Sequence, residues 1–505
     1  MIRLNHSLTV FVILALLVSC NKSIVYPREE QTESSSSVNP HAIPVEYAVA
    51  SLYSFLGYDD DKTTKSNLPQ VESVSTIRMK DLRTKSVVLS SESNCDELVY
   101  LVNFTNENGY AILAADDRIT EDIITVVEEG SLSSEDLFSD YENSHGRVID
   151  FNYPTEGSGI LYSDEYPDDI FINPNTFTLF DEDNNDCYVG DYYYEGAGNS
   201  VSTPQQIINN MSLEYAINEI SSHDLLIPID DEEPGGGTTT SVITSTQTVI
   251  TSSVAPMLTV EKYWKQTSPF NDYCPTVRKY IVFGQSRTGY AGCVPLAVSK
   301  IMAHFEWPTS ITYNGIPVCW TELKSNYNSL VGKQSAAALL RLIGLECNSL
   351  YFYEGTFTFP NDAKNFLADM LFPNVNLVDY STSSVVSMLD NGCPVFICSV
   401  PHNGGLDYDL ASSHGWNIDG YKIKQTTTTR KYYVNGVYSH TTTTTSSPST
   451  MVHCDFGWQG SCNGYYASGI FKLNGSGVEY DNPSDTGDST NYNDYLKIIT
   501  YNRPY

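Results

Sequence analysis

Apolar residues in the first part of the chain recur with two different periods. Between residues 44 and 56 they are spaced three and four positions apart, which predicts an amphipathic helix. Residues 97–104 instead alternate apolar and polar positions, and residues 110–115 form a second apolar run after an Asn-Gly pair. This arrangement predicts two strands joined by a turn. We therefore expect the N-terminal half to combine helices with a sheet.

Two further helices are predicted from proline positions and apolar spacing. Pro204 suits a first helical turn, and we expect the helix that it opens to reach about Ser222. The second helix begins at Cys293, after which apolar residues recur at steps of three and four until Pro308 marks the end. Cys293 thus stands at a helix N-terminus, directly after Gly292.

The composition changes sharply between residues 230 and 254. An acidic stretch with a proline and three consecutive glycines is followed by a run rich in serine and threonine. Such a sequence cannot build a core, so we predict an exposed linker at 230–254 where a protease can cut. A chain of 505 residues is expected to hold two or three domains. The linker therefore separates a domain at 42–229 from one at 255–505.

The N-terminus resembles an export signal. A single positive charge is followed by an apolar run over residues 8–18 and then by Ser19-Cys20. The run is too short to cross a bilayer as a mature helix. Because its end resembles a bacterial lipobox, we expect a lipoprotein signal peptide at 1–19, a lipid on the thiol of Cys20 and a flexible tether at 20–41. A plain signal peptide with an incidental cysteine is the alternative.

The charge balance and the cysteines exclude several classes of function. The formal net charge is −33, and the chain lacks the clustered Lys and Arg that nucleic-acid binding requires. The eleven cysteines form no Cys-x-x-Cys pair and no Cys/His cluster at zinc spacing. We therefore expect neither a metal nor an organic cofactor. A disulfide between Cys454 and Cys462 remains open.

Cys293 is the candidate nucleophile. The positive end of the helix macrodipole would stabilise its thiolate, and Gly292 would allow a substrate backbone to approach. The alternative for Cys293 is an inert, buried side chain. A thiolate nucleophile also needs a base. Among the nine histidines, His414 has the most suitable context, with small neighbours and a predicted strand after it, and His453 is the alternative.

Asp455 is the third candidate catalytic residue. Its carboxylate could hold the imidazole of His414 and determine which ring nitrogen carries the proton. The alternative for a single aspartate on a strand is a solvated or locally bonded side chain. The combination of cysteine, histidine and aspartate, rather than any one of them, indicates nucleophilic catalysis.

Several segments resemble, in order, the motifs of the streptopain-like cysteine peptidases. They are Tyr263-Trp-Lys-Gln-Thr-Ser-Pro-Phe-Asn271, Ala291-Gly-Cys-Val294 followed by Ile301-Met302 and Trp307-Pro308, His414-Gly-Trp-Asn-Ile-Asp-Gly-Tyr421, and Asp455-Phe-Gly-Trp458. The segment Gly109-Tyr-Ala-Ile-Leu-Ala-Ala-Asp-Asp-Arg118 is similar to the propeptide of the same family. The resemblance extends from about residue 45 to the C-terminus.

The resemblance implies an α+β chain in which a papain-like catalytic domain of two subdomains follows an α+β inhibitory pro-domain. It implies that Gln266 and the backbone N–H of Cys293 bind the oxyanion, with Gln285 as a rival donor closer to Cys293 in sequence. The residues implied to line the site are Gly292, Trp416, Phe456 and Trp458.

Two positions depart from the family pattern. Asp455 stands where the family usually has Asn, and Phe456 stands where it has Trp. A carboxylate can orient an imidazole, so we expect activity to survive. We also expect a buried Asp455 to raise the pKa of His414.

Together these features predict a thiol endopeptidase that is made as a zymogen. The expected partners are protein or peptide substrates, with a separate cognate inhibitor as a further candidate. We expect an exported monomer that touches the membrane only through its lipid anchor, on the periplasmic or outer face of a bacterial outer membrane. The alternatives are a Cys-His-Asp acyltransferase or amidase, and a decayed peptidase fold that serves as a surface binding lipoprotein.

Overall fold

The computed structural model describes residues 39, 41–57, 69–78, 97–137, 171–173, 178–180, 204–224, 240–278, 286–351, 355–399, 414–472 and 496–504. The predicted signal peptide, Cys20 and nearly all of the predicted tether lie outside these residues. Among the helices of the described part, none combines the length and the apolar character needed to cross a membrane.

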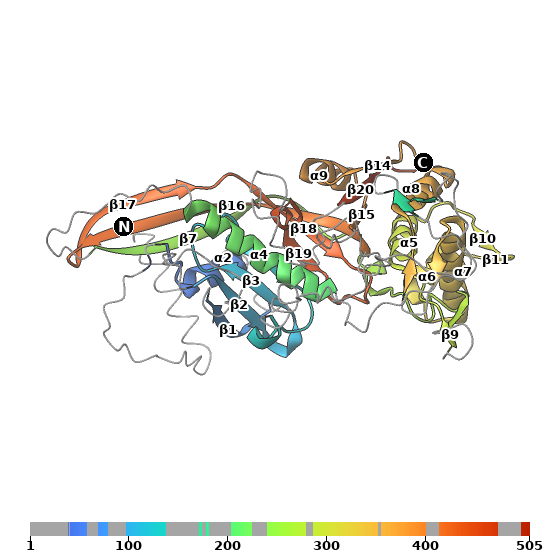
Figure 1. Cartoon of the computed structure of the whole chain (residues 1–505), viewed down its shortest axis with the longest axis horizontal. Coiled ribbons are helices and arrows are strands. Elements are labelled where there is room, and N and C mark those ends of the chain that lie inside the picture. Colours follow the sequence, from blue (N-terminus) through green and yellow to red (C-terminus); the bar gives the residue numbers. More distant parts are fainter. Residues whose placement is uncertain are drawn as a thin grey trace, which may run out of the picture. The chain divides into compact units, whose positions relative to one another are not determined.

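A 12-stranded sheet joins the two halves of the chain (Figure 1). Its main path runs through β1 (Val71–Ile77), β2 (Val99–Phe104), β3 (Tyr110–Ala114), β4 (Ile123–Val127), β19 (Gly464–Ala467), β18 (Ser449–Asp455), β16 (His414–Val434), β15 (Val395–Ser399), β20 (Lys497–Thr500) and β14 (Asn376–Asp379). Strands β7 (Thr240–Val254) and β17 (Val437–Thr445) also pair with β16. The two halves meet where β4 pairs antiparallel with β19.

The described helices of the C-terminal half include one largely buried helix, which begins at Cys293. They are α5 (Cys293–Phe305), α6 (Trp320–Asn326), α7 (Leu330–Glu346), α8 (Pro360–Asp369) and α9 (Thr382–Asp390). Helix α5 contacts α7 and α8 on one side and strands β15 and β16 on the other (Figure 1). Short strand pairs complete this region: β8 (Thr276–Arg278) with β9 (Ser286–Thr288), β10 (Thr312–Tyr313) with β11 (Ile316–Pro317), and β12 (Leu350–Tyr351) with β13 (Thr356–Phe357).

Four predictions made from hydrophobic spacing are confirmed. The N-terminal helix is α2 (Val45–Leu56), the predicted strand pair is β2 and β3, and the helix opened by Pro204 is α4 (Pro204–Asp224). Helix α5 begins at Cys293, as the apolar spacing predicts. The N-terminal half also contains the strand pair β5 (Phe171–Asn173) and β6 (Thr178–Phe180). The described structure is therefore mixed α+β in both halves.

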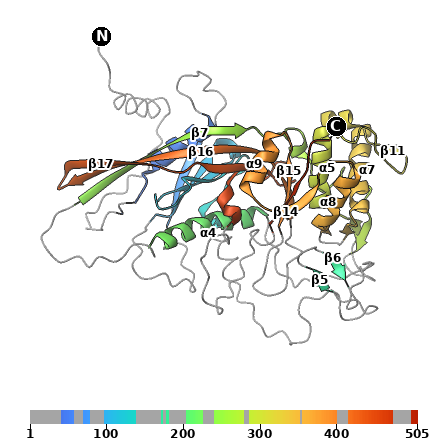
Figure 2. The same cartoon turned by 90° about the horizontal axis from the view of Figure 1, so that it is seen from above.

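The predicted linker at 230–254 is wrong for its second part. Residues 240–254 form β7, which pairs with β16 along almost its whole length (Figure 2). Valine, isoleucine and threonine favour strands, so a Thr-rich run can be a strand when a partner is present. On one face of β7, Thr244 and Thr248 are each 1% exposed, and Ser51 of α2 lies 3.2 Å from the hydroxyl of Thr246. The acidic and glycine-rich residues 230–239 lie outside the described residues.

The Thr-rich stretch 426–445 forms a hairpin. Strands β16 and β17 pair antiparallel, and the turn between them consists of Asn435 and Gly436, both with positive φ. An Asn-Gly pair suits this turn because both central residues must adopt the left-handed conformation. Strands β7, β16 and β17 run side by side as a long ribbon (Figure 2).

Several ionic contacts join the two halves of the chain. In these contacts the N-terminal half supplies the carboxylates and the C-terminal half supplies the cationic side chains. Lys424, which is 1% exposed, lies 2.5 Å from Asp122 and 2.7 Å from Glu121. Two further contacts repeat the pattern: Arg430 donates to Asp117 at 2.6 Å, and Glu128 lies 3.3 Å from His453 and 3.5 Å from Lys262.

Candidate active site

Cys293 is held at the first residue of α5 by a glycine that no other residue could replace without strain. Gly292 has φ 96°, and a Cβ there would lie 3.1 Å from both Pro295 and Thr356. The thiol of Cys293 is partly exposed. Burial raises the pKa of this thiol, while the backbone N–H groups of Gly415, Val294 and Cys293 itself act in the opposite direction. The expected stabilisation of a thiolate by the helix start is therefore outweighed by desolvation.

His414 is the first residue of β16 and is 5% exposed. Its Nε2 lies 3.1 Å from the carbonyl oxygen of Phe456. Because a carbonyl only accepts, Nε2 carries the proton in the neutral ring, and Nδ1 remains the proton acceptor. Burial lowers the pKa of His414 to about 4, and the positive charge of Lys300 contributes while the Phe456 carbonyl opposes the shift. The expectation that Asp455 raises the pKa of His414 is therefore wrong.

Aromatic rings enclose the imidazole. The ring centroid of His414 lies 5.9 Å from that of Trp416, 6.1 Å from Phe456 and 5.2 Å from Trp458. Trp416 and Phe456 are fully buried and stacked near-parallel to the imidazole. The structure thus brings three of the residues expected to line the site together at His414. These rings exclude water and account for the desolvation of the base.

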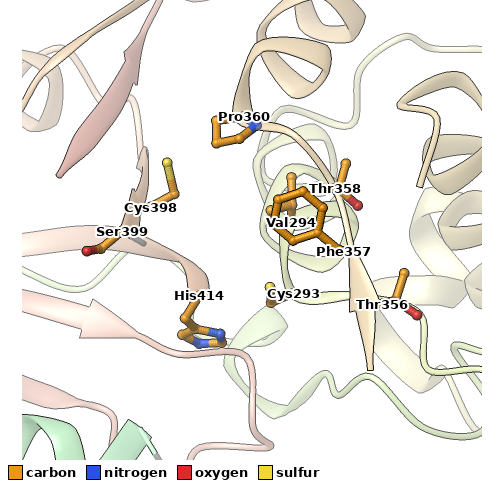
Figure 3. A pocket seen from close by; sticks show the side chains of 9 residues that line it. All are labelled: Cys293, Val294, Thr356, Phe357, Thr358, Pro360, Cys398, Ser399 and His414. Carbon is orange, nitrogen blue, oxygen red and sulfur yellow. The ribbon is translucent and has the colours of Figure 1, made fainter. Parts of the chain in front are cut away.

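Cys293 and His414 line the same cavity. Figure 3 shows the two side chains near each other among the residues that line the cavity. The remaining lining residues are Val294 of α5, Thr356 and Phe357 of β13, Thr358 and Pro360 where the chain enters α8, and Cys398 and Ser399 of β15. The cavity therefore combines a thiol and a neutral imidazole with walls that are mainly apolar.

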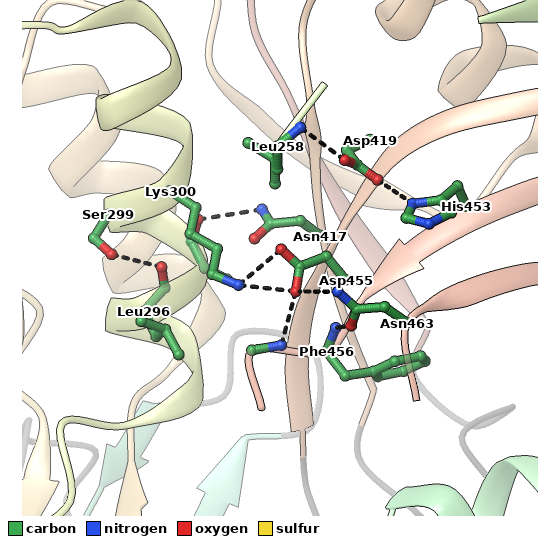
Figure 4. Close-up of polar contacts among 12 residues, drawn as sticks. Leu258, Leu296, Ser299, Lys300, Asn417, Asp419, His453, Asp455, Phe456 and Asn463 are labelled. Atoms are coloured by element: carbon green, nitrogen blue, oxygen red, sulfur yellow. Dashed lines mark hydrogen bonds and ion pairs between the residues drawn. The ribbon is translucent and has the colours of Figure 1, made fainter. Parts of the chain in front are cut away.

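Asp455 is buried at the end of β18 but does not reach the imidazole. Its two carboxylate oxygens accept hydrogen bonds from the Nζ of Lys300 at 2.8 and 2.7 Å (Figure 4). One of these oxygens also accepts from the backbone N–H of Gly457 and from the Nδ2 of Asn463, both at 3.1 Å. Within the described part of the chain, these are the hydrogen bonds that the carboxylate of Asp455 accepts. We expected the imidazole of His414 to donate to the carboxylate of Asp455. It donates instead to the backbone carbonyl of Phe456.

Gln266 is placed beside the segment that carries the nucleophile. Its backbone carbonyl accepts a hydrogen bond from Ala291, two residues before Cys293, at 2.9 Å. The preceding Trp264 is fully buried and packs on Phe270 with a centroid distance of 5.4 Å. The side chain of Gln266 is partly exposed. The rival oxyanion donor, Gln285, lies outside the described residues.

The remaining histidines are engaged elsewhere or lie outside the described residues. His453, the alternative base, is 2% exposed and lies 2.5 Å from Asp419 on the side of β18 that faces the N-terminal half. His304 contacts the carbonyl of Gly392 at 3.3 Å. His440 is exposed on β17 and stacks on Tyr432. His402 lies outside the described residues.

Two further expectations concern metals and disulfides. Cys454 and Cys462 are both free and buried, so the bridge considered between them does not form in this structure. His41, Asp116 and Asp117 have potential ligand atoms within 4.8 Å of one another. Two of these residues already have cationic partners, because Arg118 pairs with Asp116 and Arg430 pairs with Asp117.

Lys300 is the residue near the site that the sequence interpretation missed. It is fully buried, although lysine is rarely buried without a partner. The signal was present in the sequence, because Lys300 is the single Asp, Glu, Lys or Arg residue among the thirteen residues of α5. A lone charge inside an apolar helix indicates a buried partner.

One family model matches the C-terminal half. Residues 264–466 match the model of the Peptidase C10 family, and this range contains Gln266, Cys293, His414 and Asp455. No curated protein matches the chain. The match agrees with the geometry, since the thiol and the imidazole of the motif segments share one cavity. Residues 264–466 are therefore a Peptidase C10 family domain, that is, a domain of the streptopain-like cysteine peptidases.

Proposed function

We propose that the protein is an exported, lipid-anchored zymogen of a cysteine endopeptidase. The observation that carries the catalytic part is the shared cavity of Cys293 and His414 inside the Peptidase C10 domain. The helices on the Cys293 side and the sheet on the His414 side support a papain-like division into two subdomains. The lipid anchor at Cys20 rests on the N-terminal sequence pattern.

The reaction begins from a neutral pair. Burial raises the pKa of the Cys293 thiol and lowers that of His414 to about 4, so the proton resides on sulfur at neutral pH. As Sγ attacks the scissile carbonyl carbon, His414 Nδ1 takes the thiol proton and the carbonyl electron pair moves to oxygen. The resulting imidazolium then protonates the leaving amine. Water, deprotonated by His414, hydrolyses the thioester and returns the thiol.

The oxyanion is stabilised by donors near the start of α5. The backbone N–H of Cys293 belongs to the helix N-terminus, where N–H groups lack intrahelical partners. The segment of Gln266 is fastened to the residues just before Cys293 by the hydrogen bond from Ala291. A side-chain amide and a helix N–H can thus converge on one oxygen. Each such donor contributes about 3–4 kcal/mol to transition-state stabilisation.

The cavity beside Cys293 supports an apolar side chain as the main specificity contact. Its walls include Val294, Phe357 and Pro360, and no charged side chain is among the described residues that line it. An apolar side chain that enters would displace water from this surface. We therefore assign to this cavity the second residue before the scissile bond, as the family resemblance implies.

The N-terminal half supports a zymogen because it is docked on the catalytic half by several kinds of contact. Strand β4 pairs with β19, and Gly464 leaves no room for a side chain there, because a Cβ would lie 2.0 Å from the carbonyl oxygen of Val126. The backbone N–H of Glu128 donates to the carbonyl of Asn463 at 2.9 Å. Asn463 is also bonded to Asp455 and Phe456 at the site. A docked N-terminal half thus contacts the loop that carries Trp458.

Processing tests the zymogen directly. We expect the purified wild-type chain to be shortened at the linker and the Cys293→Ala chain to remain full length. Because residues 240–254 are a paired strand, the cut is expected between residues 231 and 239, and β7 stays with the catalytic half. N-terminal sequencing of the product locates the cut. A cut within 240–254, or equal self-processing of both chains, would contradict the proposal.

Because of these ionic contacts, we expect the association of the two halves after cleavage to depend on pH and to be lost in acid. The charge of Lys424 holds the pKa of Asp122 below its ordinary value of 3.8, in spite of burial. A carboxyl with a lowered pKa stabilises the complex above its ordinary pKa, and this stabilisation is lost as the pH falls through the lowered value. We expect the cleaved N-terminal segment to stay bound at neutral pH and to dissociate below about pH 4.

The variant Lys424→Met isolates this contact. It leaves Asp122 and Glu121 buried without their cation, and such a loss costs about 3–5 kcal/mol, so the cleaved segment should dissociate at neutral pH. The control is Lys431→Met, since Lys431 is exposed on the same strand. Size-exclusion chromatography of the cleaved proteins measures the association. Retention of the segment by Lys424→Met to the same extent as by the control would contradict a role for the buried cluster.

A further inference from the structure

We propose that Lys300, Asp455 and Asn463 are positioning residues, which together hold His414 in place through the backbone of Phe456. The inference rests on the proposed function of Cys293 and His414. None of the three side chains enters the cavity of the nucleophile, so none is a catalytic residue. They lie one step behind the base, between α5 and the end of β18 (Figure 4).

The first link is the ion pair between Lys300 and Asp455. Lys300 is seven residues after Cys293, about two turns along the same helix, so both lie on nearly the same face of α5. Both side chains are fully buried, and the ammonium donates to both carboxylate oxygens. Because an isolated buried carboxylate is strongly unfavourable, Lys300 is what allows an aspartate at position 455.

The second link runs from Asp455 to the base. The carboxylate accepts from the N–H of Gly457 and from the amide of Asn463, and Asn463 in turn accepts from the N–H of Phe456 at 3.0 Å. The peptide groups before and after Phe456 are thereby held in place. The carbonyl of Phe456 then accepts from His414 Nε2 at 3.1 Å. The ring orientation therefore depends on four hydrogen bonds of 3.0–3.1 Å that connect the ion pair to His414.

The ion pair also affects the charge of the base. The carboxylate of Asp455 is neutralised by Lys300 and does not contact the imidazole, so it offers no anionic partner to an imidazolium. The titratable groups that face His414 from the elements packed on it are Cys293 and Lys300 on α5, Cys398 on β15, and Asp455 behind Phe456. Of these, Lys300 lowers the pKa of His414 by its charge. Lys300 thus favours the neutral ring that accepts the thiol proton.

The test compares two variants of the whole chain in a peptide-hydrolysis assay after processing. Lys300→Met removes the cation and leaves the carboxylate unpaired, and we expect kcat to fall about 100-fold with little change in KM, as for a misplaced catalytic group. Lys300→Gln with Asp455→Asn replaces the ion pair by neutral groups of similar shape that can keep the hydrogen bonds. We expect this double variant to recover kcat to within about 10-fold of wild type.

The acidic limb of the kcat/KM profile distinguishes positioning from folding. Lys300→Met removes the positive charge that lowers the pKa of His414, so its limb moves to higher pH, whereas the double variant removes both charges of the pair and should keep a limb close to that of wild type. The control is Lys324→Met on α6, whose ion pairs with Glu261 and Glu306 lie outside the network, and it should leave kcat and the limb unchanged.

Each outcome decides a separate point. A double variant that folds but stays as slow as Lys300→Met would overturn the hydrogen-bond chain. An unchanged acidic limb in Lys300→Met would overturn the influence of Lys300 on the base. If Lys300→Met does not fold, the kcat of the double variant still decides the role of the hydrogen-bond chain. Absence of Cys293-dependent hydrolysis by the wild-type chain would instead refute the proposed function.

Discussion

Replacing Cys293 by alanine is expected to abolish peptide hydrolysis. Without the sulfur no covalent intermediate forms, and His414 has no thiol proton to accept. In an enzyme whose catalytic residues act as a unit, loss of the nucleophile lowers kcat by a factor on the order of 10⁶. The fold should persist, because alanine is smaller and the thiol is partly exposed. Hydrolysis of casein and of a fluorogenic peptide measures the effect.

The matched control is Cys319→Ala. Among the described cysteines, Cys319 and Cys293 are the two that are not fully buried, and both are free. Cys319 is the residue just before α6, outside the cavity of His414. The control should retain wild-type activity. Equal activity of the Cys293→Ala and Cys319→Ala chains would mean that the nucleophile lies elsewhere.

Replacing His414 by alanine is expected to lower kcat by a factor on the order of 10⁴. The thiol of Cys293 has a raised pKa, so without a base very little of it can lose its proton at neutral pH. The residual rate should therefore increase steadily as the pH is raised through the neutral range. Wild type should instead reach a plateau once the pH exceeds the pKa of His414, about 4.

The control for this variant is His440→Ala, since His440 is exposed on the ribbon strand β17. Its pH profile should be that of wild type. The measurement is kcat/KM against pH for the three proteins. A His414→Ala chain that keeps the wild-type plateau would show that another group serves as the base.

Local features of the fold could be predicted because they depend on spacing along the chain. The apolar period gave α2 and α5, and the alternating period gave β2 and β3. Cys293 could be assigned to a helix start because Gly292 precedes it and Pro308 follows the helix. The position of His414 at the start of a strand followed in the same way from its small neighbours and from Trp416 and Ile418.

Features that depend on a distant partner could not be predicted. Strand β7 looks like a disordered Ser/Thr run until β16 is known to pair with it. Asp455 looks like the partner of His414 until Lys300, 155 residues earlier, is found to occupy its carboxylate. Likewise, the pairing of β4 with β19 joins segments more than 330 residues apart. Their energies come from tertiary contacts, which no local pattern records.

The most direct test of the account is to find which thiol controls hydrolysis. The processed wild-type protein is treated with iodoacetamide at neutral pH, and the modified residue is identified by mass spectrometry as activity declines. Burial raises the pKa of Cys274 to about 11 and that of Cys462 to about 12, so these thiols should react slowly. The account predicts alkylation at Cys293 in proportion to lost activity, and much slower alkylation of Cys293 in the His414→Ala chain. Full activity after complete alkylation of Cys293, or loss of activity while Cys293 remains unmodified, would contradict it.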